Sequence, residues 1–80
     1  MTISLTKIEK QTGKAILAWV APVSEDGEIL SICAWFPLSQ VKVAERSLDL
    51  PEWLANRKLQ EEEEKYGYGR WTHWMAPTAA

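Results

Sequence analysis

Cysteine and histidine are nearly absent, and this limits the chemistry that the sequence can support. The 80 residues contain one cysteine, Cys33, and one histidine, His73. A single thiol cannot form an intramolecular disulfide, and a zinc site needs several cysteine or histidine ligands at short spacing. The sequence also lacks a P-loop, a dinucleotide-binding glycine pattern and paired catalytic carboxylates. We therefore predict a protein that is not an enzyme, holds no metal or cofactor, and uses Cys33 for packing in a strand.

Long apolar runs and a strong net charge are also missing. The longest apolar run, residues 15–23, is interrupted by Pro22 and is too short to cross a bilayer, and the first residues contain no signal-peptide core. The net charge of −2 gives no global attraction for nucleic acid, which would need a local basic patch. We predict a cytoplasmic protein without membrane contact, with one domain at residues 1–75 and a frayed tail at residues 76–80.

Alternating apolar residues predict the first half of a small antiparallel sheet. Ile3 and Leu5 share one face of a first strand, and the shift of phase to Ile8 indicates a bulge near its end. The next run, KAILAWVAPV, is apolar on both alternating faces, which is typical of a central strand. The pair Asp26 and Gly27 then favours a tight hairpin turn into a third strand, EILSICAWF.

The second half of the sequence predicts one more strand and a helix. Pro37 ends the third strand because it cannot donate a ladder hydrogen bond. Pro51 favours a helix start, and Gly67 or Gly69 favours its end. We expect Val41 and Val43 to face the core in a fourth strand that is interrupted and resumes at Leu48 and Leu50. Trp53 and Leu54 of the helix are expected to pack on the sheet. A second stripe then predicts a helix that is buried at its start and solvated towards its end: Ala55, Leu59, Glu62 and Tyr66.

These elements predict an α+β fold: a small twisted antiparallel sheet of about four strands, partly barrel-like, with one C-terminal helix. The helix leads into the segment QEEEEKYGYGRWTHW, in which four glutamates precede a group of aromatic residues. The glutamates suit a solvated helix surface, or a negative face that occupies a basic groove of another protein. The aromatic residues suit a core, a contact with a partner, or stacking on bases, and we predict that Trp71 or Trp74 contacts the folded body.

Three segments resemble a group of small phage and prophage proteins: TKIEKQTGKAILAWV, AWFPLSQV and LPEWLANRK, which cover roughly residues 7–58. The group has a threonine- and lysine-rich first strand, a Trp-x-Pro-x-Ser-Gln segment and a Pro-x-Trp-Leu helix start. Here these are Trp35, Pro37, Ser39 and Gln40, then Pro51, Trp53 and Leu54. Some phage proteins of this size are anti-CRISPR proteins, including inhibitors of type I (Cascade) effector complexes. The long glutamate-rich helix and the aromatic tail depart from this pattern.

The resemblance implies a phage-encoded inhibitor that binds a type I CRISPR effector complex in the host cytoplasm, as a monomer or homodimer, and blocks its access to target DNA. Acidic residues would mimic DNA in a basic cleft, and aromatic residues would serve as apolar anchors. The predicted contact residues are Asp49, Glu52, Glu61, Glu62, Glu63, Glu64, Tyr66, Tyr68, Arg70, Trp71 and Trp74.

An alternative prediction is a small-barrel protein that binds single-stranded nucleic acid, since curved sheets with exposed aromatic and lysine side chains bind such strands. The eleven acidic residues, against nine basic ones, disfavour this function. Its predicted contact residues are Lys7, Lys10, Lys14, Lys42, Arg70 and the tryptophans.

Overall fold

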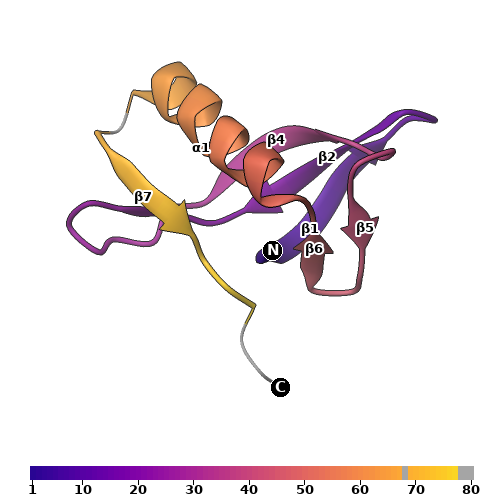
Figure 1. The fold of residues 1–80 in the computed structure, drawn as a ribbon, viewed down its shortest axis with the longest axis horizontal. Coiled ribbons are helices and arrows are strands. Elements are labelled where there is room, and N and C mark those ends of the chain that lie inside the picture. Colours follow the sequence, from indigo (N-terminus) through magenta and orange to yellow (C-terminus); the bar gives the residue numbers. More distant parts are fainter. Residues whose placement is uncertain (68, 78–80) are drawn as a thin grey trace.

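The computed structural model describes residues 1–67 and 69–77, and shows an α+β fold (Figure 1). A five-stranded antiparallel sheet has the order β4-β2-β1-β6-β5, and a second sheet pairs β3 with β7. The elements are β1 (Thr2–Gln11), β2 (Ala15–Val20), β3 (Pro22–Ser24), β4 (Ile32–Pro37), β5 (Lys42–Val43), β6 (Ser47–Asp49), α1 (Glu52–Tyr66) and β7 (Trp71–Trp74).

The α+β class is therefore confirmed, but the expectation of a partly barrel-like sheet is wrong. In the described part of the chain the larger sheet is open, with β4 and β5 as its two edges. The chain after β2 leaves this sheet at β3, which pairs with β7 instead of extending the larger sheet. The helix is also followed by β7 and is not the last element.

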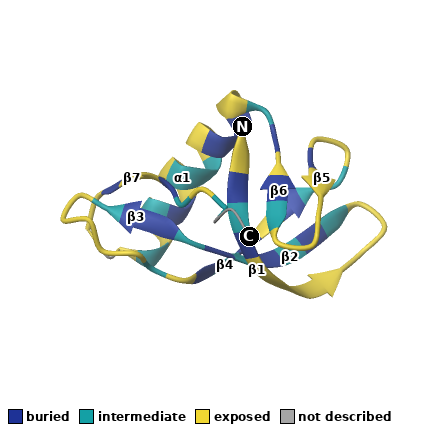
Figure 2. Ribbon diagram, turned by 90° about the horizontal axis from the view of Figure 1, so that it is seen from below, coloured by how far each residue is buried: buried dark blue, intermediate teal, exposed yellow. Residues whose placement is uncertain are grey.

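Two irregularities in β1 confirm the predicted bulge and change the direction of its side chains. Leu5 pairs with Val20 on the buried face, but the register shifts before Lys7, which lies opposite Trp19. A second shift falls between Ile8 and Lys10. Each bulge adds a residue that has no cross-strand partner. As a result, the lysines in the second half of β1 lie on the side of the sheet that faces away from the core. This half of the strand is exposed throughout (Figure 2).

The predicted hairpin around Asp26 and Gly27 is confirmed. Gly27 has a φ of 85°, which glycine adopts without strain, and its N–H donates to the carbonyl of Ser24 at 2.9 Å. Beyond the turn, Val23 forms a bridge with Ile29, and the ladder between β2 and β4 continues in the same register from Val20 and Ile32. The buried residues of β4 alternate along the strand: Ile32, Ala34 and Phe36.

The predicted fourth strand is divided into the short strands β5 and β6. Leu48 and Leu50 are buried as expected, and Val41 is buried just before β5. The expectation that Val43 faces the core is wrong, because its side chain is 41% exposed. Val43 lies opposite Leu48 on the two-residue edge strand, where part of its surface stays in solvent.

The boundaries of α1 agree with the signals in the sequence. Pro51 precedes its first residue, and Gly67 ends it in the left-handed conformation, with its N–H donating to the Glu63 carbonyl at 3.0 Å. Leu54 and Ala55 are buried, but Trp53 is 55% exposed, so the expected packing of Trp53 on the sheet is wrong. Successive helical residues are about 100° apart, and the buried stripe that begins at Leu54 therefore directs Trp53 towards solvent.

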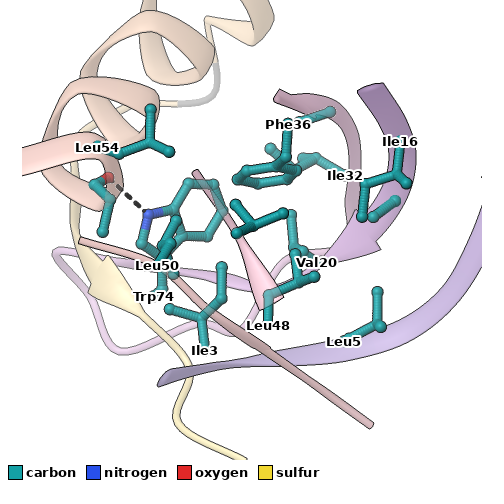
Figure 3. Packing of buried hydrophobic residues seen from close by; sticks show 14 of the residues in the cluster. Ile3, Leu5, Ile16, Val20, Ile32, Phe36, Leu48, Leu50, Leu54 and Trp74 are labelled. Carbon is teal, nitrogen blue, oxygen red and sulfur yellow. Dashed lines mark hydrogen bonds between the residues drawn. The ribbon is translucent and has the colours of Figure 1, made fainter. Parts of the chain in front are cut away.

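The chain after α1 completes the core. Trp71 and Trp74 are 5% and 6% exposed, which confirms the predicted contact of the tail with the folded body. The Trp74 indole Nε1–H donates to the Ala55 carbonyl at 2.8 Å, and its ring lies edge-on to Phe36 with 6.5 Å between centroids (Figure 3). The described chain continues to Pro77, and the expectation for residues 78–80 lies outside the described residues.

Candidate binding surface on the outer face of the sheet

The glutamate run and the aromatic tail contact each other, but they do so inside the protein. Glu62 is 5% exposed, and the Glu63 carboxylate accepts the backbone N–H of Trp71 at 2.7 Å. Trp71 and Trp74 belong to the core cluster. Three of the residues predicted to contact a partner, Glu63, Trp71 and Trp74, therefore hold α1 against β7.

The other residues predicted for partner contact are spread over several elements. The Glu61 carboxylate forms ion pairs with Arg57 at 3.0 Å and Lys58 at 3.7 Å, so cations of the same helix reduce its charge. Tyr66 is half-buried and its hydroxyl donates to the Cys33 carbonyl at 2.9 Å. Tyr68 lies outside the described residues, and the remaining residues are exposed: Asp49, Glu52, Glu64 and Arg70.

A different set of side chains forms a continuous apolar surface. Along β2 the buried residues alternate with half-buried Leu17 and Trp19 (Figure 2). Their cross-strand partners on β4 are Trp35 and Cys33, respectively. Residues opposite each other in an antiparallel ladder point to the same face, so these four side chains lie together on the side of the sheet that faces away from the core. Trp35 is the most exposed member that carries a large ring, at 38%.

Lysines from β1 border these apolar residues. The two bulges place Lys7 opposite Trp19 and Lys10 opposite Leu17, so both lysines share the face of their partners. Lys14 is exposed in the turn between β1 and β2. We call the surface formed by Leu17, Trp19, Cys33 and Trp35, together with Lys7 and Lys10, the outer face.

The local charge of this region is opposite to that of the whole chain. The first twenty residues contain Lys7, Lys10 and Lys14 but only one acidic residue, Glu9. Most of the eleven acidic residues therefore lie elsewhere in the chain. Two other cations named for nucleic-acid binding are not part of this surface: Lys42 lies in β5 at the far edge of the sheet, and Arg70 precedes β7.

Glu9 connects two residues of the outer face. Its carboxylate oxygen Oε2 accepts the Trp19 indole N–H at 3.0 Å and lies 3.3 Å from the Lys7 ammonium group. The hydrogen bond from Trp19, and then the interaction with Lys7, lower the pKa of Glu9. Both contacts therefore favour the carboxylate form of Glu9 beside the ring that it contacts.

Cys33 has the environment of a packing residue. It is half-buried on the outer face, and partial burial, followed by the charge of Glu9, raises the pKa of its thiol. A raised pKa disfavours the reactive thiolate. His73 is exposed on β7, with its Nδ1 atom 2.7 Å from the Thr72 hydroxyl. Within residues 1–67 and 69–77, no group of three or more histidine, cysteine or acidic side chains is placed to hold a metal ion.

The predicted effector contacts include only the tryptophans of the tail, whereas the alternative prediction of nucleic-acid binding named all the tryptophans, Trp19 and Trp35 among them. The run KAILAWVAPV, apolar on both faces, predicted a central strand, and β2 lies between β4 and β1. The sequence did not predict which face of this strand is covered. The structure covers only the face of Ile16, Ala18 and Val20, which are fully buried, and leaves the other face partly open.

A second surface feature lies where β5 and β6 meet the start of α1. An open groove there is lined by Gln40, Lys42, Asp49, Leu50 and Pro51. No helix of the described chain has the length and apolar character needed to span a membrane. Comparison with protein-family models, curated proteins and solved structures finds no match.

Proposed function

We propose that this protein binds single-stranded nucleic acid on its outer face, without chemical conversion of the strand. The observation that carries the proposal is the register between β2 and β4, which places Trp19 and Trp35 diagonally on neighbouring strands. Diagonal positions on one face lie about 7–8 Å apart, within reach of large rings. Two bases of one nucleic-acid strand can therefore each stack on an indole ring, and such stacking contributes about 1–3 kcal/mol per base.

Lysines at the border of the indoles supply the second requirement, which is contact with phosphates. Lys7 and Lys10 lie beside Trp19 and Leu17, and Lys14 follows in the adjacent turn. A base that stacks on a ring leaves its phosphate at the side, where an ammonium group can neutralise it. Because the first twenty residues contain three lysines and a single acidic residue, they bring a local excess of positive charge to a chain whose net charge is negative.

Fluorescence polarisation with labelled single-stranded DNA at low salt tests this function. We expect micromolar binding that weakens as salt rises, with a slope of about −0.7 in log affinity against log salt for each neutralised phosphate. The variant Trp35→Ala should bind about tenfold more weakly, which corresponds to the loss of one stacked base. Trp53→Ala is the matched control, because Trp53 is the other strongly exposed tryptophan and lies on α1.

The proposal fails if the wild-type protein shows no salt-sensitive binding, or if Trp35→Ala and Trp53→Ala weaken binding equally. Circular dichroism of both variants should be recorded first, so that loss of fold is not mistaken for loss of a contact. A blunt duplex of the same length should bind more weakly than the single strand, since its bases are already stacked on each other.

A second candidate function is the inhibition of a type I CRISPR effector complex through protein contact. The observation that favours it is the start of α1, where Trp53 is 55% exposed beside the exposed acidic residues Glu52 and Asp49. This segment is also part of the resemblance to small phage proteins. An exposed tryptophan with neighbouring acids suits an apolar anchor with complementary charge for a basic cleft.

Binding to purified Cascade-type complexes, followed by a gel shift with target DNA, tests this second function. Wild-type protein should co-purify with the complex and prevent the shift, and Trp53→Ala should lose at least tenfold in inhibition, as an interface anchor does. Trp35→Ala is now the control and should inhibit normally. Failure to bind any such complex removes this function and leaves the proposal for the outer face untouched.

A further inference from the structure

We propose that Glu9 is a positioning residue of the outer face: it fixes the Trp19 indole for stacking and, by holding Lys7, limits the affinity for phosphate. The inference rests on the proposed binding of single-stranded nucleic acid and assigns a role to an acidic residue that contacts that surface. Two contacts of the Glu9 carboxylate carry it, the hydrogen bond from Trp19 at 3.0 Å and the ion pair with Lys7 at 3.3 Å.

The position of Glu9 in a bulge of β1 supports a role for its contacts with Trp19 and Lys7. Glu9 is the residue between Ile8 and Lys10 at which the register shifts, so it has no cross-strand partner in the ladder between β1 and β2. Its side chain is 47% exposed. The bulge instead brings the carboxylate back over the outer face, where it meets the edge of the Trp19 ring.

The direction of this hydrogen bond leaves the ring available for a base. An indole N–H lies in the plane of the ring, so an acceptor at its edge does not cover either face. The bond restricts rotation of the Trp19 side chain before a ligand arrives. Binding to a fixed ring costs less side-chain entropy than binding to a mobile one, which raises affinity.

The charge of Glu9 acts in the opposite direction. A phosphate that approaches Lys7 competes with a carboxylate already 3.3 Å from its ammonium group, and the carboxylate repels the phosphate. The two effects can be separated by substitution. Glu9→Gln keeps an oxygen acceptor for the Trp19 N–H and removes the charge, whereas Glu9→Ala removes both.

The experiment compares wild-type protein, Glu9→Gln and Glu9→Ala in two measurements. Polarisation titrations with single-stranded DNA at several salt concentrations report affinity and salt slope. The indole N–H signal of Trp19 in a nitrogen–proton NMR spectrum, recorded without DNA, reports whether its hydrogen bond persists. We expect Glu9→Gln to bind about three- to tenfold more tightly, with a slope steeper by up to about 0.7, and to keep a hydrogen-bonded indole signal.

Glu9→Ala should shift the Trp19 indole signal towards that of a solvent-exposed indole and should bind more weakly than Glu9→Gln. Equal affinities for the two variants, or an unchanged indole signal in Glu9→Ala, would overturn the positioning role. Weaker binding by Glu9→Gln than by wild-type protein would overturn the role of the charge. If none of the three proteins binds DNA, the proposed function fails and the affinity effect with it, while the indole signals still decide whether Glu9 positions Trp19.

Discussion

At the scale of single residues, the two tryptophans of β7 have the same burial but different polar surroundings. The Trp74 N–H donates to the Ala55 carbonyl, whereas the Trp71 N–H is buried and has no partner among the described residues. A buried N–H without a partner loses its hydrogen bonds to water and gains nothing in return. The indole of Trp71 therefore contributes through its apolar area, and that of Trp74 through area and a hydrogen bond.

This difference leads to a prediction for two matched substitutions. Trp74→Phe removes ring volume and the hydrogen bond to Ala55, whereas Trp71→Phe removes similar volume together with an unpaired N–H. We expect Trp74→Phe to lower the free energy of unfolding by roughly 1–3 kcal/mol more than Trp71→Phe does. Chemical denaturation of both variants measures the difference. Equal losses would mean that the bond to Ala55 adds no net stability.

At the scale of elements, local patterns identified most strands and both ends of the helix. Apolar runs predicted β2 and β4 as strands, and the Asp-Gly turn predicted the hairpin between them. Pairing between distant segments was not predictable in this way. The partner of Pro22 is Trp74, and nothing in the sequence around either residue specifies the other.

The same limit explains why the sequence did not predict the open face of β2. A strand that is apolar on both faces can have both faces covered by other elements, or it can have one face covered and the other face exposed for binding. Sequence does not distinguish these cases, because the second layer is made by α1 and β7 far along the chain. The direction of Lys7 also depends on a bulge, and a shift of one residue moves a side chain to the opposite face.

The open edge of β4 has features that prevent another strand from pairing with it. The Leu38 N–H donates to the Lys14 carbonyl, so Pro37 directs its backbone nitrogen to the open edge, where it has no hydrogen to donate. The Tyr66 hydroxyl occupies the Cys33 carbonyl at 2.9 Å. Proline and occupied carbonyls hinder the addition of another strand. This protects an edge that lies beside exposed Trp35.

At the scale of the whole molecule, the chain after α1 connects parts that would otherwise be held by few contacts. The Met75 N–H donates to the Ala21 carbonyl at 2.7 Å, and the Met75 carbonyl accepts the Ser4 N–H at 2.8 Å. This single residue therefore links β1 to the segment between β2 and β3. Together with Trp74, which contacts α1 and Phe36, it joins both sheets and the helix into one core.

Two truncations test this role of the last strand. Removal of residues 71–80 deletes β7 with both buried tryptophans, each worth about 2 kcal/mol of apolar burial, and leaves β3 without a partner. The combined loss of at least about 4 kcal/mol is a large part of the 5–15 kcal/mol typical of a domain. We expect no cooperative thermal transition, or one lowered by at least about 15 °C.

Removal of residues 76–80 alone is the control, because it keeps Met75 and both tryptophans. The melting temperature should then stay within about 3 °C of that of the full chain, which corresponds to a loss of less than about 1 kcal/mol. If the longer truncation melts like the full chain, β7 is not part of the cooperative core.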